Sequence, residues 1–140
     1  MNPVKDAHIK PLPTPDGDSE AYWQGLKRGQ ILLQHCLDCG HLQVYQESIC
    51  RTCTSERLEH RAASGRGKIH SFSVVYRAPG PAFKNDTPYA VILVELEEGV
   101  RMISSMVECP VEDVAFDMPV ELVCDPVAED VVLPRFRPRR

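Results

Sequence analysis

Two short stretches decide the fold of this chain: CLDCG at residues 36–40 and CRTC at residues 50–53. Each contains two cysteines separated by two residues, and ten residues lie between the pairs. A CxxC pair forms a tight turn whose backbone amides point at the sulfur atoms, and Gly40 can adopt the positive φ that such a turn needs. Residues 42–45 are then expected to form a strand of a zinc ribbon. The expected metal ligands are Cys36, Cys39, Cys50 and Cys53.

Zinc is favoured over iron for this cluster because zinc is the usual structural ion of four-cysteine sites, although the same ligands hold iron in rubredoxin-like sites. Four thiolates close the coordination shell, so the metal is expected to be structural. Two alternatives use the same cysteines: a pair of disulfides, or one redox-active CxxC. A reducing compartment disfavours the disulfides. The second pair at ribbon spacing disfavours a redox role for the first.

The composition indicates a folded protein of the size of one domain. The chain has 140 residues, of which 43% are hydrophobic and 26% are charged, as is typical of globular proteins. The longest apolar run covers residues 89–94, far short of the roughly 20 residues of a membrane helix. Prolines at positions 3, 11, 13 and 15 argue against a secretory signal near Met1. We therefore expect a cytoplasmic protein with no membrane partner.

The apolar pattern predicts a mainly β chain in three parts. Residues 1–30 are expected to form an extended, proline-rich arm and a short helix, and residues 31–62 a rubredoxin-like zinc ribbon. Residues 63–140 are expected to form a five-stranded OB-fold barrel with an arginine-rich C-terminal tail. The expected barrel strands cover 65–76, 89–96, 100–107, 118–124 and 131–136, with a helical turn within 109–116.

The short helix has one apolar face, which includes Trp23. Asp16 or Asp18 is expected to cap its start, and Gly29 to end it. The apolar face has two interpretations: it packs on the body of the same chain, or Trp23 docks on a partner protein, since so short a helix is marginal alone.

Charge is strongly segregated along the chain. Residues 23–84 contain nine basic and four acidic side chains, residues 85–130 contain one basic and 12 acidic, and residues 131–140 contain four arginines. Nucleic-acid affinity depends on basic side chains that neutralise phosphates. The acidic barrel therefore argues against nucleic-acid binding, although the basic segment 57–84 could still contact phosphates.

Nine short blocks occur in a fixed order along the chain. They are YWQGL at 22–26, LLQHCLDCG at 32–40, the CRTC pair, SGRG at 64–67, SFSVV at 71–75, PYAV at 88–91, VEL at 94–96, MPV at 118–120 and LPRF at 133–136. In this order they resemble the zinc-ribbon plus OB-fold family of acyl-CoA-associated proteins, long described as a domain of unknown function. The resemblance covers about residues 16–137.

The resemblance implies a non-catalytic accessory subunit of a thiolase-superfamily enzyme that acts on acyl-CoA thioesters. In such hetero-oligomers of thiolase, acyltransferase or aldolase type, the catalytic residues belong to the large subunit, and the small subunit helps to form the CoA or acyl site. Some members are instead fused or bound to hydratases. Two alternatives are a nucleic-acid-binding or scaffold module of zinc-ribbon and OB type, and a free-standing acyl-CoA binder.

Direct contact with CoA is expected to use basic side chains for the phosphates and aromatic ones near the pantetheine or acyl part. The alternative is that these groups form a solvated surface or a protein interface. The candidates are Arg61, Arg66, Lys68, Arg77 and Lys84, with Phe83 and Tyr89.

The C-terminal arginines surround one aromatic residue, Phe136. Arginine and aromatic side chains are enriched at interface hot spots. We therefore expect Phe136 to anchor the tail on a partner, and Arg135 to pair with a carboxylate either of the partner or of the chain's own acidic barrel.

Overall fold

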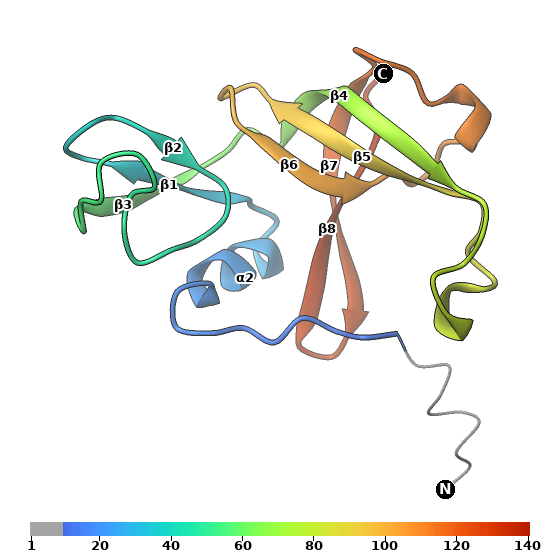
Figure 1. Cartoon of the computed structure of the whole chain (residues 1–140), viewed down its shortest axis with the longest axis horizontal. Coiled ribbons are helices and arrows are strands. Elements are labelled where there is room, and N and C mark those ends of the chain that lie inside the picture. The colour runs from blue at the N-terminus through green and yellow to red at the C-terminus, as the bar shows by residue number, and fades with distance from the viewer. Residues whose placement is uncertain (1–9) are drawn as a thin grey trace, which may run out of the picture.

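The computed structural model describes residues 10–140 as two β-sheets that lie side by side, with one short helix below the junction (Figure 1). The first part of the expected arm, residues 1–9, lies outside the described residues. In chain order the elements are α2 (Glu20–Lys27), β1 (Leu32–Cys36), β2 (Leu42–Gln43), β3 (Leu58–Ala62), β4 (Arg66–Val75), the 3₁₀ turn η1 (Pro81–Phe83), β5 (Tyr89–Leu96), β6 (Arg101–Ser105), the 3₁₀ turn η2 (Val111–Asp113), β7 (Pro119–Ala128) and β8 (Val131–Pro138).

The smaller sheet has the order β2-β1-β3, and all of its pairs are antiparallel. β1 is its central strand and contains the buried residues Leu33, Gln34 and Cys36. The loops after β1 and β2 contain the cysteine pairs. This is the ribbon that the CxxC spacing predicts.

The larger sheet has the order β6-β5-β4-β7-β8. β5 alternates between half-buried and buried residues along its whole length, as expected for a strand with one face in a core. The two edge strands also meet, because Met106 forms a parallel bridge with Phe136 and the Val107 amide donates to the Phe136 carbonyl at 2.8 Å. The sheet thereby closes into the predicted five-stranded OB-type barrel.

β4 is bent in its middle and tightly packed at its start. The register with β5 shifts between Ile69 and Ser71, which indicates a β-bulge at His70. At Gly67, an added Cβ would lie 2.4 Å from the Glu95 carbonyl oxygen. Only glycine permits this approach of the two strands. This is a structural reason for the second glycine of the SGRG block at residues 64–67.

The helix α2 begins at Glu20, and the residue at its N-terminal cap is Ser19. The expectation that Asp16 or Asp18 occupies the cap is therefore wrong. Asp16 and Ser19 instead bond each other reciprocally: the Ser19 amide donates to Asp16 Oδ1 at 2.8 Å, and the Asp16 amide donates to Ser19 Oγ at 3.1 Å. Gly29, with φ of 84°, follows the helix end as predicted.

The apolar face of α2 packs on the chain's own body, as the first of the two interpretations expected. Leu26 is 1% exposed, and Tyr22 and Trp23 pack against the core. The indole Nε1 of Trp23 donates to Ser19 Oγ at 3.2 Å. Trp23 therefore contributes to folding of this chain.

The last expected barrel strand, 131–136, is β8, which extends to Pro138 and so includes part of the expected arginine-rich tail. It pairs with β7 from Val120↔Pro138 to Ala128↔Val131. Phe136 has no exposed surface and belongs to the core, where its ring is not available to a partner. The expected role of Phe136 as a partner anchor is therefore corrected to a core role.

We predict that Phe136→Ala lowers the free energy of unfolding by about 3–5 kcal/mol, because it leaves a cavity where β6 and β8 meet. Urea denaturation followed by far-UV circular dichroism measures the loss, with Phe136→Leu as an intermediate case. The control is Val127→Ala, since Val127 is 37% exposed on β7. Equal, small losses for both alanine variants would contradict the core role.

Candidate metal centre and the surfaces around it

The four cysteines of the ribbon lie together. The Sγ atoms of Cys36 and Cys53 are 3.5 Å apart, those of Cys39 and Cys50 are 3.6 Å apart, and all four lie within 4.8 Å of one another. Four sulfur atoms bonded to zinc at about 2.3 Å form a tetrahedron with edges of about 3.8 Å. The cluster therefore has the size of a zinc site.

Each cysteine pair forms a turn that directs backbone amides at sulfur. The Cys39 amide donates to Cys36 Sγ, and the Thr52 amide to Cys50 Sγ, both at 3.4 Å. The amide of Cys39, together with other neighbouring donors, lowers the pKa of the Cys36 thiol to about 6. The turn amides favour the thiolate form that binds a metal ion, whereas burial and hydrogen bonds to the other thiols raise the pKa of Cys39 and Cys53.

Each of the two turns ends in a residue with a positive φ, but the sequence predicted only the one at Gly40. Gly40 has φ of 81°, as expected, and the second turn places Thr54 at φ of 64°. The Thr54 hydroxyl donates to the Cys53 carbonyl oxygen at 2.6 Å. A threonine in this conformation has no simple sequence signal.

A buried pair of glutamines positions the loop that contains Cys50. Gln34 and Gln43 are each 5% exposed, and Gln43 Nε2 donates to Gln34 Oε1 at 2.8 Å. Gln43 also bonds Ile49 and the Arg51 amide, on either side of Cys50. The sequence did not predict this network, because it depends on the pairing of β1 with β2, which places Gln34 opposite Gln43.

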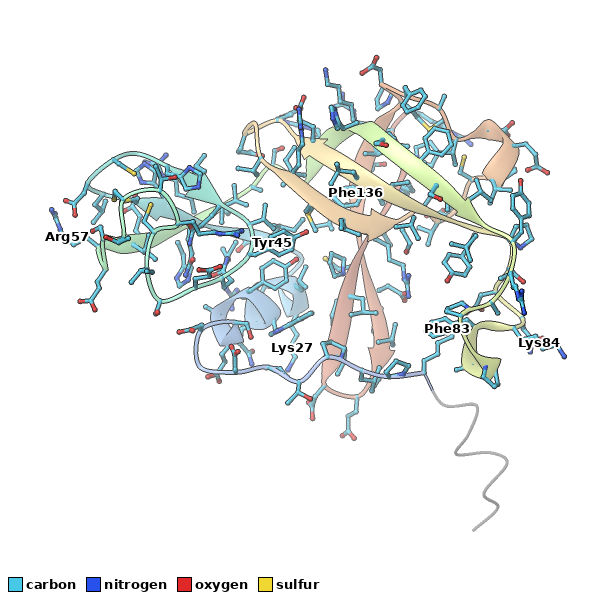
Figure 2. All side chains as sticks on the ribbon, in the orientation of Figure 1. Lys27, Tyr45, Arg57, Phe83, Lys84 and Phe136 are labelled. Carbon is cyan, nitrogen blue, oxygen red and sulfur yellow. The ribbon has the colours of Figure 1, made fainter. Side chains whose placement is uncertain are left out.

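A second connection joins the two turns on the surface. Asp38, inside the first CxxC, accepts hydrogen bonds from the Ser55 hydroxyl and from Arg57 Nη1, the latter at 2.6 Å. These bonds, the one from Ser55 first, lower the pKa of Asp38. Arg57 lies at the outer end of the ribbon in Figure 2.

The predicted CoA-contact residues fall into two separate groups. Arg61 lies on β3, and Arg66 and Lys68 lie at the start of β4. Arg77, Phe83 and Lys84 belong to the β4–β5 connection, and Tyr89 starts β5. The strand runs seven residues from Lys68 to Val75, which pairs with Tyr89, so the groups lie about 23 Å apart at about 3.3 Å per residue. The structure therefore does not gather all seven into one site.

The first group is paired with acids of the same chain. Arg61 lies 3.4 Å from Glu59, and Lys68 lies 3.7 Å from Glu95. Arg66 contacts both carboxylate oxygens of Glu97, and its hydrogen bond is the main cause of the lowered pKa of that acid.

The second group lies at the opposite end of the barrel from the ribbon, where Figure 2 shows Phe83 and Lys84 near η1. Arg77 and Lys84 are exposed. Lys10 lies over the Phe83 ring, with 5.8 Å from Nζ to the ring centre, and pairs with Asp86 at 2.6 Å. Among residues 10–140, the ion pairs of the seven candidates are confined to the first group.

Arg135 pairs with the chain's own barrel, which is the second of the two expected outcomes. Its Nε donates to Asp125 Oδ2 at 2.6 Å, and its Nη1 donates to Ser105 Oγ at 2.6 Å. Arg135 is 27% exposed. The side chain thus connects β8 to both β7 and β6.

Arg137 of β8 and Arg139, just after the strand, contact acids in the same way. Arg137 lies 3.1 Å from Glu121 and 3.4 Å from Glu108. Arg139 lies 3.5 Å from Glu97. Three arginines of the basic C-terminus therefore pair with acids of the segment before it within one barrel.

A cleft of about 660 Å³ lies between the ribbon and the barrel. Tyr45 lies at this junction in Figure 2, and its hydroxyl accepts a hydrogen bond from the Ile103 amide of β6 at 3.1 Å. The lining comes from residues 40–45, Arg51 and residues 98–101. Arg51 and Arg101 are the arginines of this lining.

Within residues 10–140, none of the helices has both the length and the apolar character that crossing a membrane requires.

Two family descriptions match consecutive parts of the chain. A rubredoxin-like zinc ribbon domain of ChsH2 matches residues 23–59, and a C-terminal OB-fold domain of ChsH2 matches residues 60–125. A DUF35 domain-containing scaffold protein of Methanocaldococcus jannaschii is 36% identical over 110 residues, which is 77% of each chain. These matches define the class: zinc-ribbon and OB-fold proteins.

Further relatives are named as subunits of acyl-CoA enzymes. A probable enoyl-CoA hydratase alpha subunit of Thermomonospora curvata is 31% identical over 96% of this chain, which spans only 41% of that relative. The benzoylsuccinyl-CoA thiolase subunit BbsA of Geobacter metallireducens is 36% identical over 66% of this chain and 60% of its own length.

A solved structure supports the same assignment. The chain described as "Ltp2-ChsH2(DUF35) aldolase" has a TM-score of 0.80 and 31% identity, covering 90% of this chain and 98% of that one. The present chain therefore belongs to the DUF35 family, as the ordered sequence blocks predict.

We predict one zinc ion per chain, bound by the four ribbon cysteines. Cys36→Ser should lose the metal and unfold the ribbon, because metal binding supplies much of the folding free energy of so small a unit. Metal analysis of the purified protein, combined with chelator-induced loss of circular dichroism, measures both effects. Cys109→Ser is the control outside the cluster. Full zinc content in Cys36→Ser would refute the assignment.

Proposed function

We propose that this chain is a non-catalytic accessory subunit of an enzyme of the thiolase superfamily that acts on acyl-CoA thioesters. The observation that carries the proposal is the agreement between sequence and structure: relatives named as thiolase and hydratase subunits are similar to this chain in sequence, and the chain described as "Ltp2-ChsH2(DUF35) aldolase" shares its fold. The partner is a thiolase-fold catalytic subunit, and the assembly is a cytoplasmic hetero-oligomer.

The chemistry of the chain's own cysteines supports an accessory role. A metal held by four thiolates has no open position for water or substrate. Burial raises the pKa of the Cys109 and Cys124 thiols, which opposes their use as nucleophiles. The proposal therefore assigns the bond-making residues to the partner and a structural zinc ion to this chain.

The proposal also includes contact with CoA in the assembled complex. The loop group, Arg77, Phe83 and Lys84, is favoured over Arg66 and Lys68, because acids of the same chain already compensate the charges of the latter pair. Exposed cations without a nearby acid attract phosphate more strongly.

Isolation of the native complex tests the accessory role. A tagged chain purified from its source cells after nuclease treatment should retain a thiolase-fold protein in stoichiometric amount, identified by mass spectrometry. A free-standing acyl-CoA binder would instead purify alone and bind CoA. A nucleic-acid module would lose its companions on nuclease treatment and bind single strands in a salt-dependent way. Either result would overturn the proposal.

Charge reversal separates the two groups of CoA candidates. In the isolated complex, Arg77→Glu with Lys84→Glu should weaken CoA binding several-fold, measured by isothermal titration calorimetry. The matched control, Arg66→Glu with Lys68→Glu, should leave the affinity within twofold of the wild type. Both pairs should keep their zinc. The opposite order of effects would locate CoA at the ribbon end of the barrel, and no effect of either pair would remove CoA contact from this chain.

A further inference from the structure

The outer face of β4, β5 and β6 has an uncharged apolar centre. The register places Leu93 opposite Ile103 on one side and Ser71 on the other, and the next row toward η1 contains Val91 between Ser73 and Ser105. Tyr89 and Val75 form the following row.

These side chains point away from the barrel core. The alternate residues of β5, from Ala90 to Leu96, are buried, whereas Leu93 and Val91 are half-buried and Ile103 is 63% exposed. Tyr45, at 50% exposed, extends the patch toward the ribbon, since its hydroxyl meets the Ile103 amide. Contiguous apolar surface of this kind marks an interaction site more often than isolated exposed residues do.

The position of this face is that of a binding surface in OB-folds generally. β5 and β6 are the second and third strands of the barrel, and that face binds oligonucleotides or oligosaccharides in other OB proteins. Nucleic-acid binding there needs stacking aromatics along a basic groove. Here the central rows contain aliphatic and serine side chains instead, so the face fits a protein surface.

One end of the face has two arginines whose positive charges are only partly paired with acids. Arg101, two residues before Ile103 on the same face, contacts Glu95 only through Nε, at 3.3 Å, and is 50% exposed. Arg51 contacts Glu47 through Nε at 3.5 Å and is 57% exposed. Both arginines line the cleft between the ribbon and the barrel. Guanidinium groups of this kind bind carboxylates through their terminal nitrogens.

From this combination we infer that the outer face of β4–β6, continuous with the ribbon–barrel cleft, is the docking surface for the catalytic subunit. The occupant is a surface segment with aliphatic side chains over Ile103 and Leu93 and a carboxylate at Arg101 and Arg51. This inference rests on the proposed function.

A second copy of this chain fits the face less well. Glu95 is the one carboxylate on the outer face of β4–β6, and it is already shared between Arg101 and Lys68. Two copies face to face would bury arginines without acids to meet them, which is costly. Charge complementarity therefore favours a different, acidic partner.

Reconstitution tests the surface. The catalytic subunit recovered with the wild-type chain is remixed with purified variants, and affinity is measured by biolayer interferometry. Ile103→Glu should weaken binding at least tenfold, as for a central interface residue. Arg101→Glu should weaken it several-fold and reduce its salt dependence. Val127→Glu, a matched exposed β-branched residue on β7, should bind as the wild type does. Zinc content and circular dichroism verify that each variant is folded.

The outcomes separate the surface from the proposed function. A folded Ile103→Glu variant that binds normally overturns the docking surface and leaves the accessory role intact. Equal losses for Val127→Glu and Ile103→Glu also overturn it. A wild-type chain that purifies without a catalytic subunit refutes the proposed function and the occupant together. A homodimer that Ile103→Glu converts into monomers, seen by light scattering, assigns the face to a second copy and overturns the inference.

Discussion

The gathering of four thiolates within 4.8 Å is the constraint on which the ribbon depends. Thiolates at this distance repel one another unless a cation lies between them, so the turn geometry and the metal stabilise each other. The strands alone are weak: β2 has two residues, and β1 and β3 have five each. The buried side chains of Gln34 and Gln43 also stabilise the ribbon, because their hydrogen bonds connect the second cysteine turn to β1 and β2.

The ribbon in turn fixes one side of the barrel junction. The Ala63 amide donates to the Ile31 carbonyl at 2.8 Å where the chain leaves the ribbon, and Tyr45 reaches Ile103 on β6. At Gly25 an added Cβ would lie 2.9 Å from a side-chain atom of Leu32, so α2 packs tightly on β1. A metal bound at this closed site would stabilise the ribbon, and with it the contacts of the ribbon with α2 and β6.

Local patterns predicted the fold better than they predicted the roles of individual residues. The cysteine spacing and the alternation along β5 are local, and both were sufficient. Phe136 was placed in an expected strand, but its role as a partner anchor was wrong, because the arginines around it are typical of an interface. Its burial arises from pairing with Leu122 and Met106, residues distant in sequence. The CoA candidates, likewise, were grouped by charge along the sequence, and a single extended strand separates them in space.

Ion pairs within the chain reduce the effect of the acidic barrel sequence on the charge of the barrel surface. Arg135 and Arg137 of β8, with Arg139 just after it, pair with acids of β7 and of nearby loops, so part of the negative charge of residues 85–130 is compensated within the barrel. The face of β5 and β6 is one part of the barrel surface where apolar side chains, among them Ile103, are exposed. A fold that binds nucleic acids elsewhere is thereby suited to recognition of a protein, because function follows from the chemistry of the face and not from the topology of the barrel.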